Sequence, residues 1–185
     1  VPVHAGSDGA FWMAVTHIIL KEWHHEKQTP YFLDYTKQYT DSPFLVKLEK
    51  EGANYVPGQL VRANEISEFS TVENGDWKLV IPKGTMGHRW EKKGGNWNMK
   101  LEHELDDQPY DPYLTLLRNN DEILQVDFTE FGLDMHRQRG VPIKYIQTST
   151  GKIPVTTVYD LVMAQYGVDR GLGGDYPKDY TDKDA

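Results

Sequence analysis

The residues best suited to binding a ligand lie at the start of the chain, in the turn Gly6-Ser7-Asp8 before the apolar run "AFWMAV". Backbone N–H groups at a helix start have no intrahelical partner and favour anionic oxygens, and glycine lets a ligand approach the backbone closely. The Asp8 carboxylate would repel a phosphate, but it can accept from an exocyclic amine or a ribose hydroxyl. The turn therefore predicts contact with the guanosine or ribose end of a nucleotide. The alternative is that Ser7 or Asp8 simply caps the helix.

Histidine and arginine side chains supply a second group of candidates. His17, His24 and His25 could share a helix face, but no pair has the i, i+4 spacing of a helical metal site with a carboxylate nearby. The other candidates are cationic groups that we expect in loops: His88-Arg89, His136-Arg137 and Arg139. The alternative is that they are solvated turn residues or members of surface ion pairs. We expect no metal site here.

No catalytic centre is evident in the residue pattern. The chain has no cysteine, no G-x-S-x-G turn and no P-loop, so the usual nucleophile and phosphate motifs are missing. The absence of cysteine also excludes disulfides, thiolate zinc sites and iron–sulfur ligation within these 185 residues. The prediction is a nucleotide contact without catalytic residues.

Two helices should position the opening turn. Phe11, Trp12, Val15, Ile18, Ile19 and Trp23 recur at helical spacing, which predicts a helix over 8–27. Thr29-Pro30 is typical of a helix start, and a second helix should follow. We expect the rings of this second helix to pack back on the first: Tyr31, Phe32, Tyr35 and Tyr39.

Strand-like sequence begins near Pro43, with short β-branched runs between Gly, Pro and Asn. Residues 92–140 should form long loops with short strands, of which 113–118 and 123–128 are the best candidates. A hairpin is predicted around Ser149-Thr150-Gly151, and Thr156 or Thr157 should cap a last helix that ends at Gly167. The acidic, glycine-rich tail should need other protein to order it.

Charge and hydropathy restrict the partners. The formal net charge is −8, and the longest basic cluster is Lys92-Lys93, so a basic nucleic-acid-binding face is not expected. No run of 18 apolar residues is present, so we expect no direct membrane span. The chain begins with Val1 in a strand-like pattern, which suggests a fragment of something larger.

Four longer blocks resemble one known family: "VPVHAGSDGAFWMAVTHIILKEWH", "PYFLDYTKQYTDSPFLVKLE", "MGHRWEKKGGNWNMK" and "VTTVYDLVMAQYGVDRGL". They are similar, in order, to pieces of the catalytic alpha subunit of membrane-bound respiratory nitrate reductase and of its relative nitrite oxidoreductase. The resemblance covers most of residues 1–173. It implies an internal fragment of a much longer molybdopterin guanine dinucleotide oxidoreductase of the DMSO reductase superfamily.

The resemblance assigns Gly6, Ser7 and Asp8 to a guanine dinucleotide contact. Ser7 replaces the family's common Thr and keeps the hydroxyl, whereas Ala5 stands where many members have Pro. The implied cofactor is molybdenum bis(molybdopterin guanine dinucleotide). The family's iron–sulfur and molybdenum ligands belong to upstream motifs that are missing here, so no catalytic or metal-binding residue is assigned.

The fold class implied is α/β, or α+β as a fragment: the edge of a molybdopterin-oxidoreductase α/β domain carrying a strand-and-loop insertion. The expected parts are 1–44, helical and cofactor-binding; 45–140, the insertion; 141–170, a hairpin and helix returning to the domain; and 171–185, an acidic linker.

The parent protein is expected to reduce nitrate to nitrite, the fragment alone being inactive; the alternatives are nitrite oxidation and a non-catalytic subunit-docking module. Implied partners are the rest of the alpha subunit, an iron–sulfur beta subunit and, indirectly, a membrane cytochrome b-type subunit. Location would be at the membrane through these partners, on the cytoplasmic face, with the periplasmic or extracellular face as the alternative.

Overall fold

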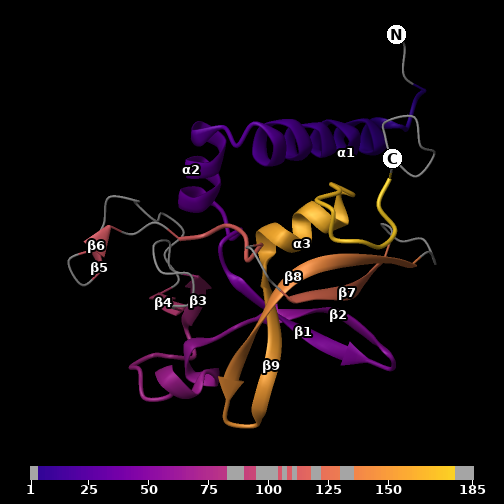
Figure 1. The fold of residues 1–185 in the computed structure, drawn as a ribbon. Helices are drawn as coiled ribbons and strands as arrows, with labels where there is room; N and C mark the ends of the chain where they lie inside the picture. The colour runs from indigo at the N-terminus through magenta and orange to yellow at the C-terminus, as the bar shows by residue number, and fades with distance from the viewer. Residues whose placement is uncertain are drawn as a thin grey trace.

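A helical arm lies over a small β-barrel, with one short helix between them (Figure 1). The computed structural model describes residues 4–82, 90–94, 104–105, 108–109, 112–117, 122–129 and 136–177. Helices and strands follow one another in segregated runs, so the prediction of a mixed α+β fragment is confirmed.

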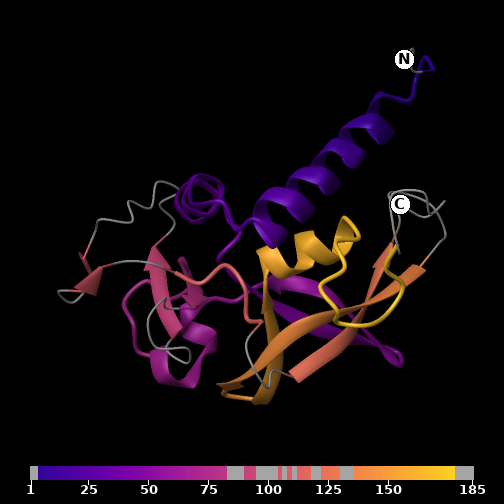
Figure 2. The same cartoon turned by 45° about the horizontal axis from the view of Figure 1, so that its top comes forward.

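The helical arm consists of α1 (Asp8–Ile18), the π-helix η1 (Ile19–Glu26) and α2 (Pro30–Tyr39). The first predicted helix is therefore confirmed in extent, but its second half has wider turns: the Lys27 amide donates to Glu22 O five residues back, at 2.9 Å. Gln28, at φ 45°, ends this run, and Pro30 occupies the first turn of α2. In Figure 2, α1 projects from the body toward the N-terminus.

Only one ring of α2 packs as expected. Phe32 lies 5.8 Å from the Trp23 ring and 5.7 Å from the His24 ring, centroid to centroid. The other three rings are exposed, so the expectation that they pack on the first helix is wrong: Tyr31, Tyr35 and Tyr39. They stack along α2 itself instead, with centroids of Tyr35 and Tyr39 5.0 Å apart.

Five strands close the barrel in the order β1-β2-β7-β8-β9: β1 (Leu45–Glu51), β2 (Asn54–Leu60), β7 (Glu122–Thr129), β8 (His136–Thr148) and β9 (Gly151–Thr157). Neighbours are antiparallel except β2 and β7, which meet in parallel at Tyr55 and Val126. Strand β9 pairs back on β1, with Leu45 opposite Thr157, and this pairing closes the ring. Residues 123–128 thus form part of β7, as predicted.

Two apolar clusters fill the barrel and its ends. One is centred on fully buried Leu45, Val61 and Val155, and the other on Val126 and Val141. Complete burial of such side chains stabilises a fold by about 1.5–3 kcal/mol each relative to exposure. These clusters therefore form the buried apolar core that holds the barrel strands together.

Shorter elements surround the barrel. The described ones are the 3₁₀ turns η2 (Ala63–Glu65) and η3 (Ser67–Phe69) and the strand pairs β3 (Lys78–Pro82) with β4 (Trp90–Gly94) and β5 (Glu104–Leu105) with β6 (Gln108–Pro109). Residues 113–117 run without regular structure, so the strand predicted over 113–118 is wrong.

Helix α3 (Val158–Gln165) crosses the top of the barrel beneath the arm (Figure 1). Thr157 caps it, because its Oγ1 accepts from the Asp160 amide at 3.0 Å, whereas Thr156 donates to Pro142 O at 2.8 Å. Gly167, at φ 70°, follows its end, as predicted.

The segment after α3 lies along β8. The Gly140 amide donates to Gly173 O at 2.8 Å, and the Asp175 amide donates to Gln138 O at 2.7 Å. The expectation that other protein must order the tail is therefore wrong for residues 171–177. Residues 178–185 lie outside the described part, and the division into four parts remains a prediction.

Within the described residues, no helix is both long enough and apolar enough to cross a bilayer.

Candidate functional site

The turn Gly6-Ser7-Asp8 forms an open helix start. Gly6 has φ 86°, a conformation that favours glycine, and, apart from its chain neighbours and the backbone of α1 itself, none of the described residues comes within 4 Å of the position that a Cβ would take at Gly6 or Gly9. The Phe11 amide makes the first helical bond, to Ser7 O at 3.0 Å. The turn is thus accessible to a ligand at the outer end of α1.

Ser7 does not cap α1 with its side chain. Its hydroxyl donates instead to His4 O at 2.6 Å and so stabilises the turn that precedes the helix. Asp8 is exposed in the first helical turn, where a carboxylate is favourable for the helix dipole. The simple capping alternative is therefore wrong for the Ser7 side chain.

The side chains of this turn offer hydrogen-bond acceptors, which is the chemistry that the N–H edge of a guanine base requires. The Asp8 carboxylate has two acceptor oxygens, and a guanine edge presents adjacent N–H donors. The Ser7 oxygen, after donating to His4, can still accept a hydrogen bond. Glycines on both sides leave space for close approach.

The three histidines of the helical arm contact different parts of the chain and do not form one site. His17 Nδ1 donates to Tyr166 O at 2.6 Å and so ties α1 to the end of α3. His24 lies between the rings of Phe32 and Tyr159, and burial lowers its pKa. Burial also lowers the pKa of His25, with nearby Arg170 acting in the same direction. No group of three or more metal-ligating side chains gathers among the described residues.

The other cationic candidates also take structural positions. Arg139 is buried in β8 rather than exposed in a loop: its Nη1 donates to the α3 carbonyls Ala164 O at 2.7 Å and Gln165 O at 3.0 Å, and its Nε donates to Asp175 O at 2.9 Å. His136 and Arg137 begin the same strand. His88-Arg89 lies outside the described residues.

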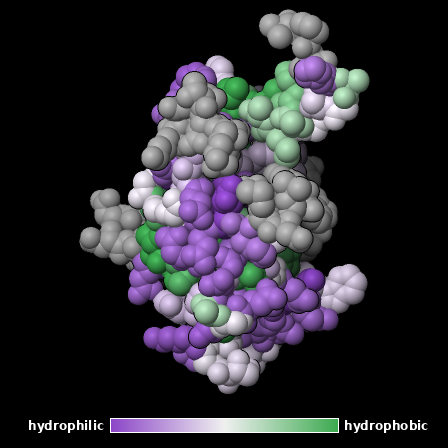
Figure 3. Space-filling view, turned by 90° about the vertical axis from the view of Figure 1, so that its right-hand side faces the viewer, coloured by the Kyte–Doolittle hydropathy of each residue, from purple (hydrophilic) through white to green (hydrophobic). Residues whose placement is uncertain are grey.

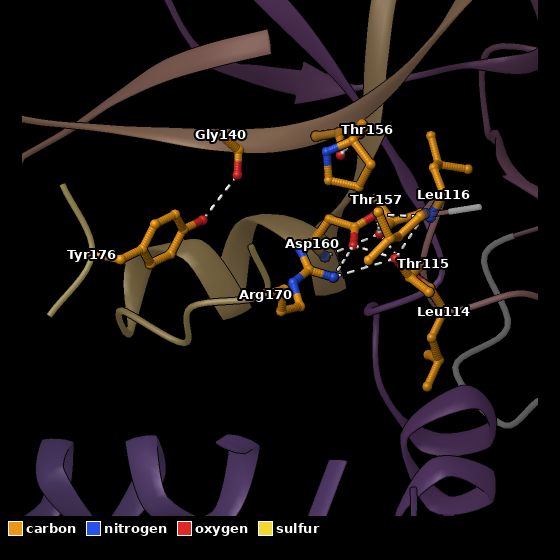
Figure 4. A network of polar contacts seen from close by, with 11 residues as sticks. Leu114, Thr115, Leu116, Gly140, Thr156, Thr157, Asp160, Arg170 and Tyr176 are labelled. Atoms are coloured by element: carbon orange, nitrogen blue, oxygen red, sulfur yellow. Dashed lines mark hydrogen bonds and ion pairs between the residues drawn. The ribbon is translucent and has the colours of Figure 1, made fainter. Parts of the chain in front are cut away.

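A buried polar cluster around Asp160 was not foreseen (Figure 4). Asp160 Oδ1 accepts from Thr115 Oγ1 at 2.5 Å and from Arg170 Nη1 at 2.7 Å, and Oδ2 accepts from the Leu116 amide at 2.9 Å. Thr157 Oγ1, 2.9 Å from Oδ2 and 2.7 Å from Leu114 O, completes the cluster. The carboxylate therefore holds the 113–117 segment, α3 and the following chain together.

The sequence contains only a partial signal for this cluster. Thr157 followed three residues later by Asp160 is a helix-start pattern, but it predicts only the cap. Thr115 and Arg170 lie far along the chain on either side, and no spacing rule connects them to Asp160.

The fold and the turn define a mixed α+β segment with an exposed, glycine-flanked helix start and no metal cluster among the residues described. No model of a known protein family matches the sequence.

Three curated proteins are similar in sequence to the chain over most of its length. The chain is 36% identical over 192 residues to the nitrate reductase alpha chain of Bacillus subtilis and 38% identical over 200 residues to the nitrate reductase alpha subunit of Mycobacterium tuberculosis (H37Rv). It is 35% identical over 192 residues to the respiratory nitrate reductase 1 alpha chain of Escherichia coli.

These alignments cover 97%, 97% and 90% of this chain but 15% of each relative. By sequence, the chain corresponds to a segment of the nitrate reductase alpha chains, and the predicted resemblance is confirmed.

Proposed function

We propose that this chain is a non-catalytic segment of the alpha subunit of a molybdenum-dependent nitrate reductase. The observation that carries the proposal is similarity at 35–38% identity over 90–97% of the chain to alpha chains bearing that name. In the parent, nitrate takes up two electrons and two protons and yields nitrite and water. Molybdenum bis(molybdopterin guanine dinucleotide) supplies the oxygen-atom transfer when bound.

Gly6, Ser7 and Asp8 would hold the guanine end of one dinucleotide. Asp8 would accept from the base, Ser7 would offer its oxygen, and Gly6 would let the backbone approach the ligand. The open space around Gly6 and Gly9 and the exposed Asp8 support this role. The turn would thus anchor a cofactor whose reacting metal is ligated by other residues of the parent.

Other parts of the parent complex would supply the electrons. An iron–sulfur beta subunit would deliver them, with the cluster ligands outside this cysteine-free segment, and a cytochrome b-type membrane subunit would connect the complex to the membrane on its cytoplasmic face. The words "respiratory" and "alpha chain" in the name of the Escherichia coli relative support a link to electron transport and the presence of further subunits.

The complete protein tests the enzymatic proposal. We expect the purified complex to contain molybdenum and to reduce nitrate with a low-potential electron donor. Assay of nitrite oxidation with an electron acceptor sets the direction, because a nitrite oxidoreductase would run faster in that sense. A metal-free complete protein, inactive in both directions, would refute the proposal and leave the docking module.

Asp8→Ala in the complete protein tests the turn. We expect lower retention of guanine dinucleotide, measured by chromatography of the released cofactor. Asp34→Ala is the matched control, because Asp34 is an exposed carboxylate on α2. Equal retention in both variants and the wild type would remove the assignment of Asp8.

A further inference from the structure

A cavity of about 280 Å³ lies between the helical arm and α3. His24 and His25 of η1 line one side and Lys37 of α2 lies nearby, while Tyr159 of α3 and Arg170 line the opposite side. The Gly6-Ser7-Asp8 turn stands at the far end of α1, so this cavity is separate from the proposed cofactor contact (Figure 2).

Arg170, one of the residues that line the cavity, has an unused hydrogen-bonding edge. Its side chain is 2% exposed, and Nη1 alone is engaged, with Asp160 and Thr115. Nε and Nη2 are buried without a partner. These two N–H groups point the same way on the planar guanidinium and match two oxygens of one anion.

Asp160 cannot turn to satisfy that edge. Its two oxygens already accept from the Thr115 hydroxyl, the Leu116 amide and Arg170 Nη1, and the Thr157 hydroxyl lies within hydrogen-bond distance. The carboxylate is fully buried and is fixed to three parts of the chain. The acceptor for the free edge of Arg170 must therefore come from outside the cluster.

His24, on the opposite side of the cavity from Arg170, adds a third unpartnered polar atom. Its Nδ1 is buried without a hydrogen bond, and its ring is held by contacts to Phe32 and Tyr159. The neutral imidazole can carry its proton on Nδ1 and donate it. All three unpartnered atoms of these lining residues can therefore act as donors, which selects an acceptor-rich ligand.

We propose that this cavity binds a small oxyanion, with two of its oxygens on Arg170 Nε and Nη2 and one further contact from His24 Nδ1. The shared chemistry is a pair of oxygens on one edge of the ligand. Both an inorganic oxyanion and a small carboxylate have this edge. Apolar wall residues such as Leu114 and Met163 restrict the space to a small ligand.

Thermal unfolding of the complete protein tests the site. Sodium phosphate, sodium sulfate and sodium acetate are titrated separately, against sodium chloride at equal ionic strength; nitrate is left out because it is the substrate of the proposed enzyme. A ligand that binds only the folded state raises the Tm, and we expect a saturable rise with at least one oxyanion but not with chloride. A rise with acetate alone identifies a carboxylate source, and a rise with phosphate or sulfate alone an inorganic one.

Two variants locate the binding. Arg170→Lys keeps the charge but removes the paired donors, and His24→Phe keeps the ring packing but removes Nδ1. We expect each to weaken oxyanion binding about tenfold or more by calorimetric titration, as loss of one charge-assisted bond does. The matched controls are Arg62→Lys and His136→Phe, both exposed and away from the cavity.

The proposal is overturned by either of two results. One is no saturable Tm rise with any of the three oxyanions, which means that water alone fills the cavity. The other is unchanged affinity in His24→Phe, which remains informative even if Arg170→Lys does not fold. Neither result depends on molybdenum or on nitrate reduction, so failure here is distinct from failure of the proposed enzymatic function.

Discussion

At the scale of single residues, Asp160 joins segments that are distant along the chain. Its carboxylate is fully buried and accepts from Thr115, Leu116 and Arg170. A buried carboxylate is costly to remove from water unless it is paired and hydrogen-bonded, and here it is both. Loss of the carboxylate charge would leave Arg170 as an uncompensated buried cation.

Asp160→Asn should therefore lower the free energy of unfolding by about 3–5 kcal/mol, the cost typical of breaking a buried ion pair from one side. Urea unfolding followed by tryptophan fluorescence measures the change. Glu22→Gln is the control, because the Lys27–Glu22 pair lies at 3.2 Å with side chains 49% and 37% exposed, and should cost no more than about 0.5 kcal/mol. Equal losses in the two variants would contradict the role of Asp160.

His24 makes stability depend on pH. Burial lowers its pKa in the folded state, so the unfolded chain binds the proton more readily. Its contribution is present above the unfolded pKa of about 6.5 and is lost as the pH falls from that value through the lower folded-state pKa. His25 acts in the same sense, since its pKa is also lowered.

His24→Phe should accordingly flatten the fall in unfolding free energy between about pH 7.5 and 5.5, although His25 leaves part of the slope. Urea titrations at several pH values measure this. His136→Phe should keep the wild-type slope, because His136 is exposed at the start of β8. A slope that is the same in all three proteins would exclude His24 as its source.

At the scale of elements, Gly140 permits the chain after α3 to lie against β8. A Cβ at this position would stand 2.0 Å from Leu172 O, a backbone atom that cannot simply rotate away. The segment is also held by Tyr176, whose hydroxyl donates to Gly140 O at 2.8 Å and whose pKa burial raises to about 12.

Gly140→Ala should detach residues 171–177 from β8 and lower stability by about 1–3 kcal/mol, as overpacking does. Hydrogen exchange should rise selectively at the amides of Gly140 and Asp175, which pair the two segments. Gly9→Ala is the control for stability, because nothing in the described part of the chain beyond α1 itself lies within 4 Å of its Cβ position. Unchanged exchange at both amides would show that the close approach is not required.

Local signals predicted the elements that depend on local chemistry. Thr157 and Gly167 mark the start and end of α3, and Ser149-Thr150-Gly151 marks the β8–β9 turn. A strand was predicted over 113–118. In the structure, the Leu116 amide and the Thr115 hydroxyl instead donate to the Asp160 carboxylate. That contact is long-range, so sequence spacing could not reveal it.

The same distinction between local and long-range signals applies to the candidate sites. The sequence predicted the open turn at Gly6, whose positive φ only glycine adopts readily. It did not predict the cavity at Arg170, because the cavity exists only where the arm, α3 and residues 113–117 meet. The change to π-helical hydrogen bonding in η1 also lacked a local signal such as proline or glycine within that helix.

At the scale of the whole molecule, the helical arm exposes many large apolar side chains. Trp12 is 64% exposed and Tyr31 72%, with Phe11 and Tyr35 also exposed. In Figure 3 the apolar colour gathers at the top of the view, over the outer part of α1. Large exposed apolar patches commonly mark interaction surfaces, and they favour association when left uncovered.

The isolated 185-residue chain should therefore bind a hydrophobic dye and self-associate at micromolar concentration. Trp12→Lys should reduce both, as measured by dye fluorescence and analytical ultracentrifugation. Trp77→Lys is the matched control, since Trp77 is 75% exposed but lies away from the arm. Equal effects of the two substitutions would show that the arm has no special part in association.

Two of the barrel's strand pairings, β1–β9 and β2–β7, should form late in folding. The β7–β8 and β8–β9 pairings join neighbouring strands, whereas the β1–β9 and β2–β7 pairings join strands separated by much of the chain. Contacts between distant residues carry a larger loop-closure entropy and form more slowly. Pulse-labelled exchange during refolding should therefore protect β8 and β9 amides that pair with each other before the amides of residues 45–47 that pair with β9. Simultaneous protection of both sets would mean that the ring closes in one step.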